Sequence, residues 1–292
     1  MRALGTFLRR HRRLRLASVL GAPVFWMLVI YLGSLVLMVV SAFYQLDDFT
    51  SKPTSEFTTE NITDALTSPA IWKVTRNSVA VAVAVTVLCF VIALPAAFYV
   101  AKIAKPWARR GLIVAMLMPL WAGYLVKGYA WKAMLRPEAG SAAANSGGGF
   151  LVSVFGWTPG FGWVAVVLAL TYLWLPYMIL PIYAGLDRLP ASLLDASGDL
   201  GAHPWRTFRS VILPLLVPSI AAGSIFTFSL SLGDFITPNI VTEGKVQMIG
   251  NIISRTLLAP NQPLAAAYTL FPLVIVIAYL ATMKRLGAFE NL

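Results

Sequence analysis

Long stretches without a charged residue constrain this chain more than any other feature. The run from Leu16 to Leu46 contains no Asp, Glu, Lys or Arg, and similar runs recur further along. A helix needs about 20 apolar residues to cross the hydrocarbon core of a bilayer. The 292 residues are 58% hydrophobic and 12% charged, far more apolar than an ordinary soluble domain. The sequence therefore predicts an all-α membrane protein.

We predict six transmembrane helices, at 19–43, 77–101, 112–131, 163–185, 210–232 and 264–283. The third span contains Lys127, which can extend to the interface from a helix end, so one charge does not exclude that span. A basic leader before the first apolar run is also typical of a secretory signal. The run is too long for a signal core and five more spans follow, so we interpret it as a retained first helix.

The basic residues predict the orientation of these spans, because cytoplasmic segments are enriched in Lys and Arg. With the N-terminus inside, fifteen of the 23 basic and four of the 12 acidic residues lie in the inner segments, which are 1–18, 102–111, 186–209 and 284–292. The outer segments are then 44–76, 132–162 and 233–263. We expect both termini in the cytoplasm. The net charge of +11 is explained by topology, so no nucleic-acid partner is expected.

Residues for catalysis or metal binding are sparse. The one cysteine, Cys89, lies in the middle of a span, and the two histidines, His11 and His203, form no cluster with metal-site spacing. Gly244-Lys245 lacks the glycine and hydroxyl residue of a phosphate-binding loop. We therefore expect a non-enzyme with no metal and no cofactor in this chain. Spans one, two, four and six carry no charge, which also disfavours a self-powered secondary transporter.

The stretch "DASGDLGAHPWRTFRSVILPLL", residues 195–216, interrupts the apolar pattern with charges, glycines and prolines. The overlapping stretch "LPASLLDASGDLG", residues 189–201, predicts a short helix, with Pro190 in its first turn, a capping box formed by Ser192 and Asp195, and a left-handed end at Gly201. Pro204 suits the first turn of a second helix, which continues into span five and should bend at Pro214. On physical grounds alone, this loop is either a connector on the headgroups or a docking surface.

The spacing within this stretch favours docking. Asp195-Ala196-Ser197, three residues, Gly201, nine residues and Val211-Ile212-Leu213-Pro214 resemble the signature loop of ABC importer permeases, which reads Glu-Ala-Ala, Gly and Ile-x-Leu-Pro at those spacings. Asp195, Ser197 and Val211 depart from that signature but keep charge or size. The resemblance implies a type I ABC importer permease fold in a bacterial inner membrane. It also implies ATPase-coupling residues, which here are Leu193, Leu194, Asp195, Ala196, Ser197, Leu200, Gly201 and Pro214.

The same resemblance implies partners for this chain. They are a second permease subunit that completes a heterodimer, two ATPase subunits that bind ATP and Mg²⁺, and an external substrate-binding protein. "MPLWAGYLVKGYAW" (118–131) and "SLSLGDFITPNIVTEGKVQMIGNII" (229–253) further resemble the first permease of the spermidine/putrescine transport family. Lys127 stands where that subfamily commonly has Arg. Polyamines are therefore the expected cargo, with opines, phosphonates, sugars or ferric iron as alternatives in related importers.

Candidate residues of a translocation path lie near the ends of spans three and five. They are Trp121, Tyr124, Lys127, Tyr129, Trp131 and Asp234. The aromatic residues form either an interfacial belt or a surface that contacts an alkylammonium group through its ring faces. Asp234 is either an ordinary acid at a helix end or a point that receives a cation. Lys127 would repel a cation unless an acid neutralises it.

Overall fold

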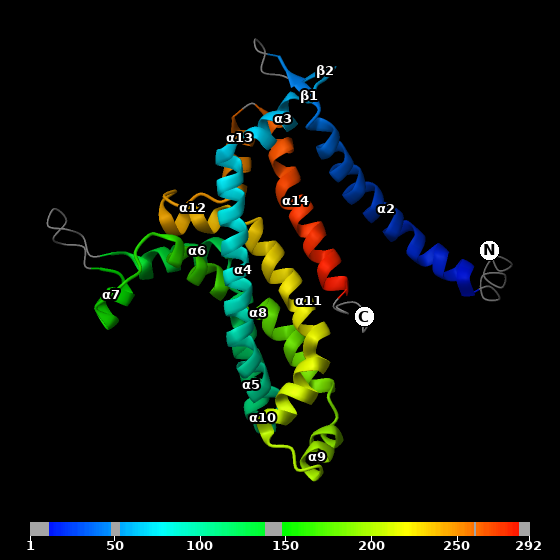
Figure 1. The fold of residues 1–292 in the computed structure, drawn as a ribbon, viewed down its shortest axis with the longest axis vertical. Coiled ribbons are helices and arrows are strands. Elements are labelled where there is room, and N and C mark those ends of the chain that lie inside the picture. Colours follow the sequence, from blue (N-terminus) through cyan, green and yellow to red (C-terminus); the bar gives the residue numbers. More distant parts are fainter. Residues whose placement is uncertain (1–11, 48–52, 138–147, 260, 286–292) are drawn as a thin grey trace. The chain divides into compact units, whose positions relative to one another are not determined.

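The computed structural model describes residues 12–47, 53–137, 148–259 and 261–285 (Figure 1). Most of the predicted inner segments 1–18 and 284–292 lies outside these residues. The chain divides into two compact units. Unit 1 comprises Met1–Thr67 and Thr256–Leu270, and unit 2 comprises Ser68–Arg255 and Phe271–Leu292.

Unit 1 contains helix α2 (Arg12–Ser41), strands β1 (Tyr44–Leu46) and β2 (Pro53–Phe57) and helix α3 (Glu60–Thr67). The strands pair antiparallel, with Tyr44 opposite Phe57. The side-chain amide of Asn61 donates hydrogen bonds to the carbonyls of Ala42 (3.1 Å) and Tyr44 (2.9 Å), which fasten α3 to the chain entering β1. The predicted outer segment 44–76 therefore contains a small hairpin, which the all-α prediction did not include.

Unit 2 contains most of the helices. They are α4 (Pro69–Phe98), η1 (Tyr99–Ile103), α5 (Pro106–Leu117), η2 (Met118–Leu120), α6 (Tyr124–Leu135), α7 (Phe150–Phe155), α8 (Trp163–Arg188), α9 (Ala191–Asp199), α10 (Pro204–Thr207), η3 (Phe208–Ile212), α11 (Leu213–Leu232) and α12 (Ile236–Thr242). Helices α13 (Ile249–Leu258) and α14 (Gln262–Arg285) are shared between the two units. The main apolar core lies where α4, α8 and α11 pack together (Figure 1), and it includes Val85, Leu170, Met178 and Leu216.

The apolar helices largely match the predicted spans. Five are long and apolar enough to cross a membrane: Pro23–Ser41, Pro69–Ile103, Trp163–Arg188, Pro204–Leu232 and Gln262–Arg285. A sixth crossing results if the bent pair Pro106–Leu120 and Tyr124–Leu135 forms one span.

The prediction of one continuous helix at 112–131 is wrong. The chain turns by 90° between Leu120 and Tyr124. Pro119 lies in the tight η2 turn and lacks the N–H that would continue a helix, and Gly123 is the N-cap of α6. The sequence did not indicate this break, because both arms of the bend are apolar and their mean hydropathy is that of one continuous span.

Small residues allow α8 and α11 to approach closely. A Cβ atom at Gly223 of α11 would lie 2.8 Å from the sulfur of Met178 and 3.2 Å from its Cα atom in α8. At Gly185 of α8, it would lie 2.3 Å from the hydroxyl of Ser219. Close backbone approach at small residues is a main source of helix association in membranes, where lipid is as apolar as the protein.

We expect Gly223→Ala to lower the free energy of unfolding by about 1–3 kcal/mol, because the added methyl group overpacks the contact with Met178. Gly111→Ala in α5 is the matched control, since no atom lies within 4 Å of the position its Cβ would take. That control should be neutral or slightly stabilising. Thermal unfolding of both variants in detergent measures the effect, and equal melting temperatures would contradict the close α8–α11 contact.

Candidate functional site

The helix–turn–helix predicted between spans four and five is present. Helix α9 ends at Asp199, and α10 begins at Pro204 after the N-cap residue His203, whose Nδ1 accepts a hydrogen bond from the Trp205 N–H at 3.4 Å. The π-helical turn η3 then joins α10 to α11. The irregularity expected at Pro214 thus takes the form of a π turn directly before it, which accommodates the missing proline N–H.

The turn after α9 depends on Gly201. This residue has φ +73°, and its N–H bonds to the carbonyl of Gly198 at 2.8 Å. The N–H of Ala202 bonds to the carbonyl of Ser197 at 3.1 Å. These two bonds define a Schellman motif, in which a left-handed residue closes a helix. The predicted left-handed end is confirmed. The predicted capping box is wrong, because α9 begins at Ala191 with Pro190 as N-cap and no side-chain cap.

One face of α9 packs inward. Leu194 contacts the main apolar core, and Ser197 shares a 2.8 Å hydrogen bond with the hydroxyl of Thr207 in α10. This bond links the two short helices across the turn. Because α10 continues through η3 into α11, α9 is connected to α11 by both the chain and a side-chain contact.

The other face of α9 presents apolar side chains to solvent. Leu200 is 88% exposed and Leu193 is 42% exposed, while Asp195 and Ala196 are also exposed. Trp205, in α10, is 64% exposed, and its ring stacks on that of Phe208 with centroids 5.6 Å apart. Pro214 is exposed in the first turn of α11. The predicted coupling residues therefore divide between an inward face and an apolar outward surface.

Polar contacts hold the base of this loop. The ammonium group of Lys102 donates to the carbonyl of Leu189 at 2.9 Å. Arg109 forms an ion pair with Asp187, and its Nε donates to the hydroxyl of Tyr183 at 2.9 Å. The end of α8 is thereby tied to η1 and α5.

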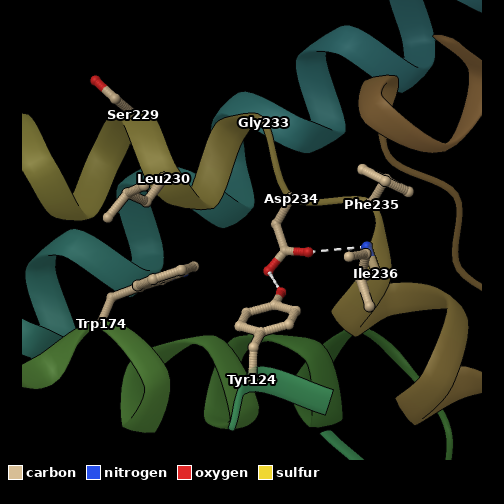
Figure 2. A pocket seen from close by; sticks show the side chains of 8 residues that line it. All are labelled: Tyr124, Trp174, Ser229, Leu230, Gly233, Asp234, Phe235 and Ile236. Carbon is tan, nitrogen blue, oxygen red and sulfur yellow. Dashed lines mark hydrogen bonds between the residues drawn. The ribbon is translucent and has the colours of Figure 1, made fainter. Parts of the chain in front are cut away.

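A second cluster lies after the C-terminus of α11, at Asp234 (Figure 2). One carboxylate oxygen accepts hydrogen bonds from the N–H groups of Ile236 (2.9 Å) and Thr237 (3.0 Å). The other accepts from the hydroxyls of Thr237 (2.8 Å) and Tyr124. Burial raises the pKa of the Asp234 carboxyl above its ordinary value, and the hydrogen bonds it accepts oppose the rise. The carboxylate thus secures the start of α12 and links it to α6.

A pocket of about 280 Å³ adjoins this carboxylate. Figure 2 shows its lining, which consists of Tyr124, Trp174, Ser229, Leu230, Gly233, Asp234, Phe235 and Ile236. The rings of Tyr124 and Trp174 stack with centroids 6.0 Å apart. The indole N–H of Trp174 is buried and has no hydrogen-bond partner in the described part of the chain. The pocket thus combines two aromatic faces, a buried acid and an unused donor.

The structure brings together only two of the six predicted path residues, Tyr124 and Asp234. Trp121 is 90% exposed at the bend, and Tyr129 is exposed on α6. Trp131 packs against Tyr172 in a separate small core, and Lys127 is half-buried. Sequence reasoning missed Trp174, which no pattern within its apolar span distinguishes. It also missed Thr237, although an Asp just before a helix commonly accepts hydrogen bonds from backbone N–H groups two or three residues later.

No group of three or more His, Cys, Asp or Glu within the described ranges could hold a metal ion. The apolar helices and these two sites define a multi-pass helical membrane protein, with exposed apolar side chains at one end of α11 and a largely apolar pocket beside a buried acid at the other.

Residues 6–288 match the family described as "Binding-protein-dependent transport system inner membrane component". The inner membrane ABC transporter permease protein YdcU of Escherichia coli is 42% identical over 289 residues, covering 96% of this chain and 92% of its own. The spermidine/putrescine transport system permease protein PotB of Haemophilus influenzae is 32% identical over 217 residues, covering 73% of each chain.

Solved structures support the same fold. A bacterial ABC transporter that imports the acidic polysaccharide alginate matches with a TM-score of 0.68 at 15% identity, over 97% of this chain and 99% of that one. The alginate transporter in complex with its alginate-bound periplasmic protein matches with a TM-score of 0.69 at 14% identity, over 96% of both chains.

These findings assign the chain to the class of multi-pass inner-membrane transport subunits. The chain belongs to the family of permease subunits of binding-protein-dependent ABC importers. Its relatives are transport subunits and not enzymes, so the enzyme and secondary-transporter alternatives are set aside.

Proposed function

We propose that this chain forms one half of a translocation path with a second permease subunit, and that α9 and α10 couple it to one of two ATPase subunits. Those subunits bind ATP and Mg²⁺, and an external binding protein delivers the cargo. The distribution of Lys and Arg supports a topology with both termini in the cytoplasm, which puts α9 on the side where ATP is available.

The observation that carries the coupling proposal is the exposure of Leu200. Leu200 is 88% exposed at the closed end of α9, and Leu193 of α9 and Trp205 of α10 are exposed as well, which leaves apolar surface for a partner to cover. The spacing of the surrounding signature supports an ATPase as that partner. Exposed aromatic and aliphatic anchors of this kind fill pockets at protein interfaces.

The path from this surface to the pocket runs along α11. The loop precedes Leu213, and Asp234 follows Leu232, so the two sites occupy opposite ends of one helix. A helix of 20 residues is about 30 Å long. When the ATPase subunits close, movement of α9 is transmitted through α10 and η3 to α11, and it displaces the segment that carries Asp234.

We expect Leu200→Asp to abolish co-purification of the ATPase subunit while leaving the melting temperature of the permease nearly unchanged, because an exposed substitution costs within about 0.5 kcal/mol. Leu200→Met, which keeps an apolar side chain, should retain the partner. Pull-down of the co-expressed ATPase measures the effect. Normal co-purification with Leu200→Asp would show that α9 does not provide the docking surface.

For the cargo we propose polyamines. The similarity to PotB supports this, as do the aromatic faces of Tyr124 and Trp174 and the buried charge of Asp234. In this conformation four donors occupy the four acceptor positions of the carboxylate. A cation would therefore contact Asp234 only after Tyr124 or α12 moves.

One observation favours a second candidate, an importer of the same class for a solute with acceptor groups. The unpaired indole N–H of Trp174 is a hydrogen-bond donor. The ammonium groups of a polyamine are also donors only, so they cannot pair with it, whereas a solute with acceptor groups can. Trp174→Phe distinguishes the two. Uptake of labelled putrescine that is unchanged in this variant supports the polyamine proposal, and absence of putrescine uptake by the wild-type importer contradicts it.

A further inference from the structure

A second pocket, of about 640 Å³, lies at the start of α4, remote in sequence from both sites described above. Lys73, Thr75 and Arg76 contribute its polar lining. Trp72, Val79 and Ile275 contribute its apolar lining. The rings of Trp72 and Phe271 pack edge-to-face with centroids 5.4 Å apart, a contact between α4 and α14 within unit 2.

Three features make this pocket attractive to an anion. Lys73 and Arg76 lie one turn apart on α4, and no acidic residue is among the residues that line the pocket. The pocket includes Pro69 at the N-terminus of a 30-residue helix. The first turn of that helix contains no acid, and Ser68 makes no side-chain cap, so its positive end is not compensated locally.

The hydroxyl of Thr75 is an independent sign of a ligand. Thr75 is 4% exposed, lines the pocket and has no hydrogen-bond partner in the described part of the chain. A helical threonine ordinarily bonds to the carbonyl four residues earlier, as Thr86 bonds to that of Ala82 at 2.7 Å. A buried hydroxyl without a partner costs free energy unless something occupies the pocket and bonds to it.

The order of residues along α4 indicates which anion. The basic residues lie in the first two turns of the span, and the apolar wall at Val79 and Ile275 follows deeper in. That order matches an amphiphile with a phosphate at the interface and an acyl chain along the helix. We propose that this pocket binds an anionic phospholipid, with Lys73, Arg76 and the Thr75 hydroxyl contacting the headgroup phosphate. This assignment does not depend on the cargo or on the ATPase contact.

The test uses the full-length protein in detergent micelles titrated with phosphatidylglycerol, and lipid retention is followed by native mass spectrometry. The double variant Lys73→Gln, Arg76→Gln should bind the lipid about tenfold more weakly, because each basic side chain near a headgroup contributes to anionic-lipid affinity. Thr75→Val, which keeps the shape of the side chain, should weaken binding about threefold by removing one hydrogen bond. Arg76→Lys should retain most of the affinity.

Arg110→Gln is the matched control, since it removes an exposed basic residue that does not line the pocket. It should leave the affinity unchanged. Inorganic phosphate at the same concentrations should neither bind nor displace the lipid. Unchanged retention in the double variant would overturn the proposal, and so would equal binding of inorganic phosphate, which would define a free-anion site. Lys73 and Arg76 are exposed, so the double variant should elute and melt like the parent.

Discussion

Replacing Gly201 by valine should reduce binding-protein-stimulated ATP hydrolysis of the assembled importer by at least about tenfold. Gly201 has φ +73°, where a β-branched residue is a genuine outlier. A left-handed conformation costs an ordinary residue about 1–2 kcal/mol. The strain is best relieved by opening the Schellman turn, which frees α9 from its angle to α10. No atom lies within 4 Å of the added Cβ, so backbone strain rather than a clash within this chain causes the effect.

Two further variants isolate the turn. Gly201→Asn should keep most of the activity, because asparagine tolerates the left-handed region. Gly198→Val places the same side chain on α9 at a position that also has open space and no positive φ, and it should retain activity. ATP hydrolysis by the reconstituted complex is the readout. Equal losses in Gly198→Val and Gly201→Val would contradict the turn and indicate steric exclusion of the partner.

Asp234→Asn should lower the free energy of unfolding by about 1–3 kcal/mol and also impair transport, because buried hydroxyls lose an acceptor. The amide nitrogen that replaces one oxygen cannot accept from Tyr124 and Thr237. The link from Asp234 to α6 and to the Thr237 hydroxyl is thereby lost, while the other oxygen still accepts from the N–H groups of Ile236 and Thr237. Thermal unfolding and uptake, measured on the same preparations, test both effects.

Glu243→Gln is the matched acid-to-amide control. Its partner is Lys132 at 3.0 Å, and both side chains are partly exposed, so the pair contributes at most about 1 kcal/mol. Tyr124→Phe should reproduce part of the Asp234→Asn effect. The double variant Tyr124→Phe, Asp234→Asn should lose less free energy of unfolding than the sum of the two single losses. Melting temperatures that fall equally in Asp234→Asn and Glu243→Gln would argue against a special structural role for Asp234.

The apolar spans were predictable because a helix in lipid needs a long run of apolar residues, and such a run is visible in the sequence. The break near Trp121 was not, since both arms of the bend have the same average hydropathy. Its geometry depends on Pro119, on Gly123 and on the packing of α6 against α12, where a Cβ at Gly128 would lie 3.3 Å from Ile240. The direction that α6 takes after the bend is therefore known only from its packing against α12.

The α9 turn was predictable for a different reason. Its breakers, Gly201 and Pro204, act within a few residues, so their effect can be read locally. The exposure of Leu200 was not readable in this way, because an apolar residue in a short helix packs inward or outward according to the surrounding helices.

By itself, the sequence determined that the chain crosses a membrane several times, that a helix–turn–helix interrupts it, and that the spacing of this interruption resembles an importer signature. These are properties of composition and of neighbouring residues. Only the tertiary structure decided that Tyr124 meets Asp234, 110 residues away, and that Trp174 completes the pocket from a third helix. The physical reason is that uniformly apolar helices carry little periodic signal about which face packs inward, so the contacts between them are selected by shape and by the few buried polar groups that must be paired.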